Sequence, residues 1–265
     1  PIKTEEMIDF LYKEGIRYFV FEDFNEYVKL SHLASKAKKI LRIDITHISP
    51  NTIEYGMTEK KLQILLNQRS MSVDDIDGIT FYLAKNKDVN SILSVLTYCE
   101  KIINIIGNNK ILNIGGNYRL PQEVGTEYYE QLLKKLNSIR SKYGYVIYME
   151  PGRSVVKSAG KLVTKIIDIK EDKHQIFLDS GLPTGISYSP NCIINISKTI
   201  EMPLKKYDFF DITCSHRLLF STELSCQISI GDILEFLNFG SYSICKSSNF
   251  HGWETPRCIY KKGVW

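Results

Sequence analysis

Two polar residues capable of chemistry directly follow an apolar, strand-like segment. Glu150 and Arg153 flank a Pro-Gly turn immediately after the apolar run Tyr145–Met149. A carboxylate beside a pyridine-type nitrogen would keep that nitrogen protonated and make the ring an electron sink. Arg153 could bind a phosphate or brace the carboxylate. A structural alternative stays open, in which Glu150 and Arg153 form an ion pair with each other at the strand end.

Two further candidates stand at the ends of other apolar runs. Gly115 and Gly116 follow the run Ile111–Ile114, and Tyr82 lies near the end of the run 76–83. Paired glycines let backbone N–H groups approach an anion closely, as a phosphate site requires. In a parallel barrel the active site lies at the C-terminal ends of the strands, so all three sets would meet there.

Helix-like and strand-like segments alternate through the first two thirds of the chain. Apolar spacing and capping residues predict helices over 4–14, 23–35, 59–68, 88–106 and 127–143. Short apolar runs predict strands over 17–21, 40–43, 76–83, 111–114 and 145–149. This rhythm is typical of parallel strands joined by crossover helices. A repeating (β/α) barrel fits better than an open sheet, because no phosphate-binding fingerprint follows the first strand.

The pattern changes after Arg153. Short strands are predicted over 162–170, 175–178, 193–196, 232–237 and 258–260, separated by turns rich in Gly, Pro, Asn and Ser. Helical periodicity is nearly absent from this part. The sequence therefore predicts two domains, an α/β domain over residues 1–153 and an all-β domain over residues 154–265.

Composition narrows the class of protein. The 265 residues are 43% hydrophobic and 24% charged, which is ordinary for a globular chain with a substantial core. The net charge is only +4 and the lysines form no dense block, so a nucleic-acid partner is unsupported. No apolar run approaches the ~20 residues that span a bilayer, and no signal peptide is visible. We expect a soluble protein with no membrane partner.

The cysteines point to a reducing compartment. Six are present, with no Cys-x-x-Cys pair and no histidine at metal-ligand spacing. Reduced thiols fit this pattern better than a disulfide framework or a zinc site. We expect a cytoplasmic protein without a metal.

Several motifs resemble those of one enzyme family. "ILNIGGNYRLP" and, further on, "EPGRSVVKSAG" resemble the pyridoxal-phosphate-dependent ornithine/diaminopimelate/arginine decarboxylase family of the alanine racemase-like fold (fold type III). "ITCSHRLL", "IGDILEFLNFGSYSI" and "NFHGWETP" follow the order of the family's closing β-domain motifs. The resemblance thus covers essentially the whole chain. It implies a (β/α)8 TIM-type barrel, with its N-terminal strands missing here, followed by a C-terminal all-β domain.

The resemblance implies roles for the residues around the cofactor, pyridoxal 5′-phosphate. Glu150 would contact the pyridine nitrogen, while Gly115, Gly116, Arg153 and Tyr242 would bind the phosphate. For Tyr242 the structural alternative, an ordinary strand aromatic, stays open.

Two positions depart from the family around the cofactor, and a third residue, Lys3, is distinct from the family's catalytic lysine. Tyr82 replaces the ring-stacking histidine; it can still stack but carries no charge. Asn117 replaces the third glycine of the phosphate turn, which puts one phosphate contact in question. Lys3 matches the lysine of a Pro-x-Lys turn, whereas the family's Schiff-base lysine belongs to a strand upstream of it, outside this chain.

The resemblance also implies catalytic and substrate-binding residues. Cys214 would be the general acid that returns a proton to the substrate after decarboxylation, reaching in from the second subunit of a homodimer. A small buried apolar residue is the structural alternative for a lone cysteine. Phe250 would line the substrate cavity. Ser215 stands where the family has an acid that grips a distal amine, and His216 follows it as a candidate substrate contact.

These implications define the expected function. The chain resembles a carboxy-lyase of amino-acid metabolism, in polyamine or lysine biosynthesis, acting on the α-carboxylate of an amino acid or an amino-acid-like intermediate. "SVVKSAGKLVTKIIDIKE" leans toward the diaminopimelate branch, whereas "NFHGWETP" is nearer the ornithine branch. A catalytically inactive relative that acts as a regulatory or dimerisation partner is the alternative.

Overall fold

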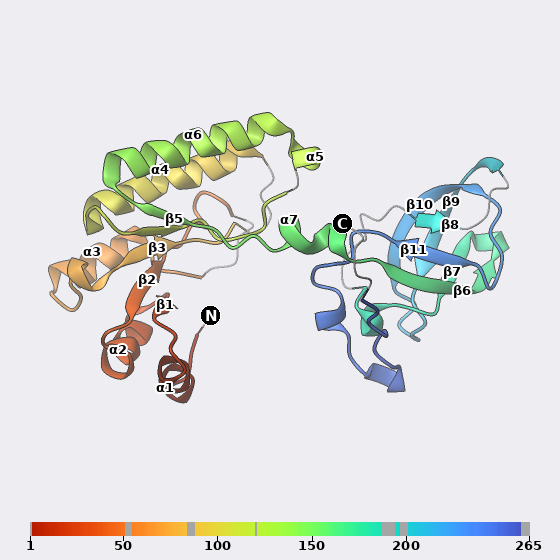
Figure 1. Cartoon of the computed structure of the whole chain (residues 1–265), viewed down its shortest axis with the longest axis horizontal. Helices are drawn as coiled ribbons and strands as arrows, with labels where there is room; N and C mark the ends of the chain where they lie inside the picture. Colours follow the sequence, from red (N-terminus) through yellow and green to blue (C-terminus); the bar gives the residue numbers. More distant parts are fainter. Residues whose placement is uncertain are drawn as a thin grey trace. The chain divides into compact units, whose positions relative to one another are not determined.

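The chain forms two units in the computed structural model, which describes residues 2–50, 55–83, 88–119, 121–186, 194–196 and 201–260. Unit 1 spans Pro1–Ser154 and unit 2 spans Val155–Trp265. Figure 1 labels the helices and strands of each unit. Each unit has its own hydrophobic core, and the two are described separately.

Unit 1 is built on five parallel strands. The strands are β1 (Tyr18–Phe21), β2 (Lys38–Arg42), β3 (Gly78–Thr80), β4 (Ile111–Asn113) and β5 (Val146–Tyr148), and they pair in chain order. The helices are α1 (Glu5–Lys13), α2 (Phe24–Leu33), α3 (Glu59–Asn67), α4 (Val89–Ile106), α5 (Pro121–Val124) and α6 (Thr126–Tyr143). The predicted alternation of five strands with helices is confirmed.

Local sequence explains where these helices begin. The side chains of Thr4, Asp23, Thr58 and Asp88 each accept a hydrogen bond from a backbone N–H of the first helical turn. Such caps satisfy donors that have no partner within the helix. Helices α4 and α6 then pack against each other on one side of the sheet, as Figure 1 shows.

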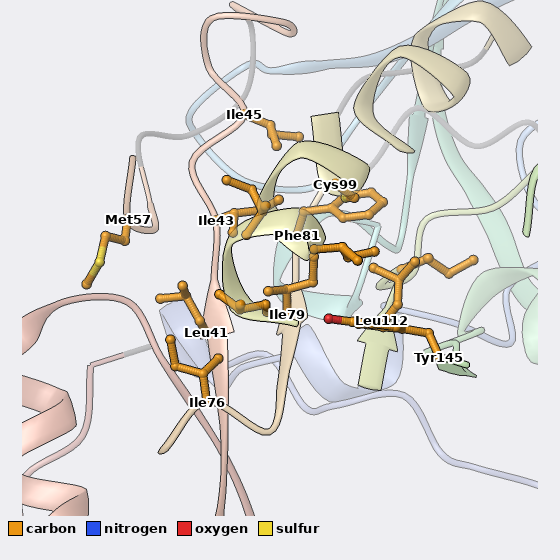
Figure 2. Packing of buried hydrophobic residues seen from close by; sticks show 14 of the residues in the cluster. Leu41, Ile43, Ile45, Met57, Ile76, Ile79, Phe81, Cys99, Leu112 and Tyr145 are labelled. Atoms are coloured by element: carbon orange, nitrogen blue, oxygen red, sulfur yellow. The ribbon is translucent and has the colours of Figure 1, made fainter. Parts of the chain in front are cut away.

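The core of unit 1 lies between the sheet and its helices. Alternate strand residues such as Leu41, Ile79 and Leu112 are fully buried on one face. Figure 2 shows their side chains gathered with those of Phe81 and Tyr145. Because strand side chains alternate between faces, the residues between them point to the opposite side of the sheet. That opposite face carries the candidate site.

Helix α4 corrects the expectation that no apolar segment of the chain approaches the length of a membrane span. Its 18 residues are long and apolar enough, by length and composition, to cross a membrane. The helix nevertheless belongs to the core of unit 1, with eight fully or nearly fully buried residues: Ile92, Val95, Leu96, Tyr98, Cys99, Ile102, Ile103 and Ile106. A core helix can have the same length and composition as a membrane span, so these properties of α4 are only weak evidence for a membrane.

Unit 2 is a six-stranded sheet with mostly antiparallel pairs. Its strands are β6 (Leu162–Lys170), β7 (Gln175–Leu178), β8 (Ile194–Ile196), β9 (Glu201–Phe210), β10 (Leu218–Cys226) and β11 (Ile233–Phe236). Their order is β10-β9-β7-β6-β11-β8, and β7 pairs with β9 in parallel. Ile166, Phe209 and Phe236 form the centre of its core. The predicted all-β character is confirmed.

Two predictions in unit 2 were wrong. Strands β9 and β10 were missed, although they pair along most of their length. Their sequences hide the pattern, because Pro203 and the lysines 205 and 206 interrupt the apolar alternation of β9. Conversely, the strand predicted over 258–260 is absent. Ile259 and Tyr260 are each 80% exposed, and no described strand pairs with them.

Candidate active site

The carboxyl ends of β3, β4 and β5 lie side by side at one edge of the sheet. Thr80 pairs in register with Asn113, and Asn113 pairs with Tyr148. The residues that directly follow these strands are therefore neighbours in space. They include the sequence candidates Tyr82, Gly115, Gly116, Asn117 and Glu150.

Both glycines are required by close backbone approaches. Gly115 has φ +64, and a Cβ atom there would lie 2.7 Å from the carbonyl oxygen of Phe81. A Cβ atom on Gly116 would lie 2.4 Å from the carbonyl oxygen of Glu150. The backbone N–H of Glu150 donates to the carbonyl of Gly115 at 2.8 Å. The glycine turn and the Glu150 segment are thus held together backbone to backbone, with no room for a side chain.

Asn117 maintains this turn in place of a glycine. Its φ is +69, in the left-handed region that asparagine tolerates better than most residues. Its Nδ2 donates to the carbonyl of Leu83 at 3.0 Å, which links the loops after β3 and β4. Tyr118 follows, and its buried hydroxyl donates to the carbonyl of Ile114 at 2.7 Å. Burial raises the pKa of Tyr118.

Glu150 is exposed and is bound by an asparagine that sequence reasoning missed. Asn113 Nδ2 donates to Glu150 Oε1 at 2.6 Å. Arg153 is also exposed and begins the short helix α7 (Arg153–Val156). Among the described residues, no ion pair joins Glu150 to Arg153. The alternative in which Glu150 and Arg153 pair with each other at the strand end is therefore not what the structure shows. Asn113 is the polar residue in the otherwise apolar run 111–114, and this is the sequence signal that could have identified it.

The exposed face of the sheet carries further polar and aromatic side chains. Arg42, at the end of β2, is in register with Thr80, and its guanidinium lies 5.1 Å from the ring centroid of Tyr55. The rings of Tyr18 on β1 and Tyr148 on β5 are 6.3 Å apart. A hydrogen bond with Tyr18 raises the pKa of Tyr148.

The contact between these tyrosines reports the curvature of the sheet. Strands lie about 4.8 Å apart, so a flat five-stranded sheet would separate its edge strands by roughly 19 Å. Ring centroids at 6.3 Å require the sheet to curl toward this face. A curled parallel sheet with helices outside is the geometry of a (β/α) barrel wall.

In unit 2, Cys214 projects from the loop between β9 and β10. Its side chain is exposed, unlike Cys99, which is fully buried and whose pKa burial raises. Asp211 is almost fully buried, and its Oδ1 accepts hydrogen bonds from the backbone N–H and the hydroxyl of Thr213, at 3.0 and 2.7 Å. The Thr213 and Ser215 hydroxyl oxygens are 2.6 Å apart. Hydrogen bonds among Asp211, Thr213 and Ser215 thus restrain the loop around Cys214.

The other candidates of unit 2 lie on exposed loops. The ring of His216 stacks on Phe210, with centroids 4.4 Å apart. Tyr242 has φ +54 and is half exposed, and Lys246 Nζ lies 5.4 Å from its ring centroid. Phe250 is 59% exposed. A role for these residues beside the residues of unit 1 stays a prediction.

A family model described as "Pyridoxal-dependent decarboxylase, pyridoxal binding domain" matches residues 1–157. The chain belongs to this decarboxylase family. Ornithine decarboxylase of Rattus norvegicus is 23% identical over 304 residues, covering 100% of this chain and 66% of the relative. A carboxynorspermidine/carboxyspermidine decarboxylase of Campylobacter jejuni is 26% identical over 211 residues, covering 72% of this chain and 54% of the relative. The chain spans about two thirds of the length of its ornithine decarboxylase relatives.

Solved structures show the same fold for this decarboxylase-family chain. The arginine decarboxylase of Paramecium bursaria Chlorella virus superposes with a TM-score of 0.80 at 20% identity, covering 95% of this chain and 73% of that one. Diaminopimelate decarboxylase from M. jannaschi gives 0.77 at 20% identity, covering 97% and 67%. The predicted architecture, a barrel followed by a β-domain, is confirmed.

The residues at the edge of unit 1 suit the cofactor named by the family. Pyridoxal phosphate is an aromatic ring with a basic nitrogen at one position and a phosphate at another. The edge offers an exposed carboxylate at Glu150, an exposed aromatic at Tyr82 and a glycine turn at Gly115 and Gly116 whose backbone lies against the Glu150 segment. A carboxylate matches a pyridinium, and a side-chain-free turn matches a phosphate.

Proposed function

We propose that the protein is a pyridoxal-phosphate-dependent carboxy-lyase that removes the α-carboxylate of an amino acid or an amino-acid-like intermediate. The observation that carries this proposal is the Glu150 carboxylate, fixed by Asn113 beside the glycine turn at the ends of parallel strands. When bound, the cofactor supplies an electron sink for the bonding pair that the departing CO2 leaves behind.

The residues of unit 1 would bind and tune the cofactor. Glu150 holds a proton at the ring nitrogen by charge complementarity. Gly115 and Gly116 bring the backbone close to the phosphate, and Arg153 adds a cation there. Tyr82 offers an aromatic face for the ring.

Unit 2 would supply the remaining groups, in a cytoplasmic homodimer with shared sites. Cys214 would hold the proton that is returned to the substrate carbon; its thiol is exposed on a loop that the Thr213–Asp211 hydrogen bond restrains. Tyr242 is a further phosphate ligand, and Phe250 lines the substrate cavity. The resemblance to the family is the support for these three roles.

The loop after Cys214 argues against a simple diamine-forming substrate. Ser215 and Leu218 offer no carboxylate, and the Ser215 hydroxyl is engaged with Thr213. The nearby acid, Asp211, is buried; its Oδ1 accepts two hydrogen bonds from Thr213, and its Oδ2 has no hydrogen-bond partner among the described residues. A desolvated ammonium without a carboxylate partner costs several kcal/mol. The substrate would therefore end in a carboxylate, a carbonyl-containing group or a larger conjugate, with His216 as a candidate contact.

A substrate panel tests the function and its specificity together. CO2 release is measured on the full-length protein, including the segment that supplies the Schiff-base lysine, with added pyridoxal phosphate and ornithine, lysine, arginine, meso-diaminopimelate or carboxylate-ended analogues. We expect cofactor-dependent CO2 release, with a higher kcat/KM for the substrates that end in a carboxylate. A preference for ornithine or lysine would remove the specificity proposal while leaving the activity. No cofactor-dependent CO2 from any substrate would remove the activity itself.

A second candidate, a catalytically inactive binding partner, rests on one comparison. Antizyme inhibitor 2 of Xenopus laevis is 25% identical over 98% of this chain and 64% of the relative, and its name describes no decarboxylase. The two candidates differ in one measurable combination. An inactive partner would form a mixed dimer with an active homologue and change its turnover, yet release no CO2 alone.

A further inference from the structure

Asn113 occupies the junction between the two parts of the candidate cofactor site. It is the last residue of β4, and its neighbours Leu112 and Ile114 are buried in the core on the other face. Its Nδ2 donates to Glu150 Oε1 at 2.6 Å, and its Oδ1 accepts from the backbone N–H of Gly115 at 2.9 Å. One amide thus connects the carboxylate to the glycine turn.

We propose that Asn113 is a positioning residue that fixes Glu150 for the ring nitrogen of the cofactor and couples it to the phosphate turn. The inference rests on the proposed function and deepens it. With Oε1 held by Asn113, the second carboxylate oxygen of Glu150 is left for the pyridinium. With its Oδ1 held by Gly115, the amide itself cannot rotate freely.

The chemistry of an amide suits this task better than a cation or an apolar side chain would. Glu150 is exposed, and an exposed glutamate without a partner samples several rotamers. A lysine or arginine would fix it but would also neutralise the charge that should hold the ring proton. A neutral N–H donor restrains the carboxylate and leaves its negative charge to the ring. An apolar residue would lose both hydrogen bonds.

The backbone supports the same geometry independently of the side chain. The N–H of Glu150 donates to the carbonyl of Gly115, and the N–H of Ile114 donates to the carbonyl of Tyr148. These bonds set the distance between β4 and β5 next to Asn113. Removing the amide should therefore free the Glu150 side chain while leaving the strand pairing in place.

Binding of two cofactor analogues tests the proposal without relying on activity. Pyridoxamine 5′-phosphate carries the same ring and phosphate but forms no covalent bond with a lysine; its 1-deaza analogue has C–H in place of the ring nitrogen. Isothermal titration calorimetry would measure the affinity of each analogue for wild type, Asn113→Ala, Glu150→Ala and the double variant. We expect Asn113→Ala to weaken pyridoxamine phosphate about tenfold and the deaza analogue far less. In the Glu150→Ala background, Asn113→Ala should lose its ring-nitrogen effect.

Asn137→Ala is the matched control. Asn137 is an exposed residue of α6, so the same substitution there removes an amide away from the ends of the strands. It should leave both affinities unchanged, and thermal unfolding of every variant would show that it is folded. Equal weakening of both analogues by Asn113→Ala would overturn the inference alone, since Asn113 would then serve only the glycine turn. Failure of wild type to bind either analogue would overturn the proposed function and this inference with it.

Discussion

The two units present their candidate residues in opposite ways. In unit 1, a backbone hydrogen bond joins Glu150 to Gly115, and Gly116 lies against the Glu150 carbonyl, at the ends of core strands. In unit 2, Cys214 and Tyr242 lie on exposed loops, one braced by short-range side-chain contacts and the other in a left-handed conformation. The family model covers the first region, residues 1–157.

This difference separates two demands on a catalyst. Binding a rigid cofactor needs groups fixed to within fractions of an ångström, which a sheet edge supplies. Delivering a proton to different substrates tolerates, and benefits from, a loop on a rigid scaffold. We therefore expect substitutions at the sheet edge of unit 1 to affect chemistry more than those on the loops of unit 2.

The largest effect should come from Glu150→Gln. The amide keeps the shape and can still accept from Asn113, but it carries no charge to hold the ring proton. In the full-length protein that supplies the Schiff-base lysine, we expect kcat to fall on the order of 10² to 10³-fold, with a much smaller change in cofactor affinity. Unchanged kcat in steady-state assays would remove Glu150 from the mechanism and make the edge of unit 1 merely a binding surface.

A stability comparison inside unit 1 comes next. Lys3 Nζ and Glu26 Oε1 form an ion pair at 2.9 Å with side chains only 13% and 2% exposed, whereas Lys13 and Asp9 pair on the surface. Glu26→Gln leaves a shielded ammonium without its carboxylate, so unfolding free energy should fall by about 3 kcal/mol. Asp9→Asn should change it by less than about 1 kcal/mol. Similar losses of unfolding free energy in urea for both variants would contradict the claim that the shielded Lys3–Glu26 ion pair stabilises unit 1 more than the surface pair does.

Cys214→Ala probes the loop of unit 2. We expect turnover to fall about 10 to 100-fold, because water can replace a general acid partly. Mixing Cys214→Ala with Glu150→Gln should restore activity above the sum of the two parents if two subunits build each site. Mixtures that never exceed that sum would mean that unit 2 serves its own chain or none.

The smallest predicted effect is a loss of stability at alkaline pH that arises in unit 1. Burial raises the pKa of Cys99, Tyr118 and Tyr145 above their ordinary values. The folded chain therefore keeps protons that the unfolded chain releases, so stability is intact below about pH 9 and falls as pH rises. Each of the three groups should contribute a slope of at most about 1.4 kcal/mol per pH unit above its pKa in the unfolded chain. Tyr145→Phe should reduce the slope measured in urea titrations, and an unchanged slope would exclude Tyr145.

Local patterns made unit 1 predictable. Capping residues such as Thr4 and Asp88 stand directly before apolar helices, and the strands are short continuous apolar runs. In unit 2, β9 and β10 are strands because they pair with each other, and no local pattern announces that pairing.

The candidate site was predictable in its residue types but not in its contacts. The residue types and spacing of Glu150, Gly115 and Gly116 indicated chemistry at strand ends. The contact between Asn113 and Glu150 was not predictable, because it joins residues 37 positions apart and exists only through the pairing of β4 with β5. The bracing of Cys214 by Asp211 likewise depends on a loop conformation.

One measurement tests directly whether Glu150 keeps the nitrogen of a bound pyridine ring protonated at this edge. Pyridoxamine 5′-phosphate labelled with 15N in the ring would be bound to the protein and its nitrogen chemical shift measured by NMR. We expect the chemical shift of a protonated pyridinium in wild type near neutral pH, and that of an unprotonated ring in Glu150→Gln. An unprotonated nitrogen in wild type, or the same shift in both proteins, would contradict it.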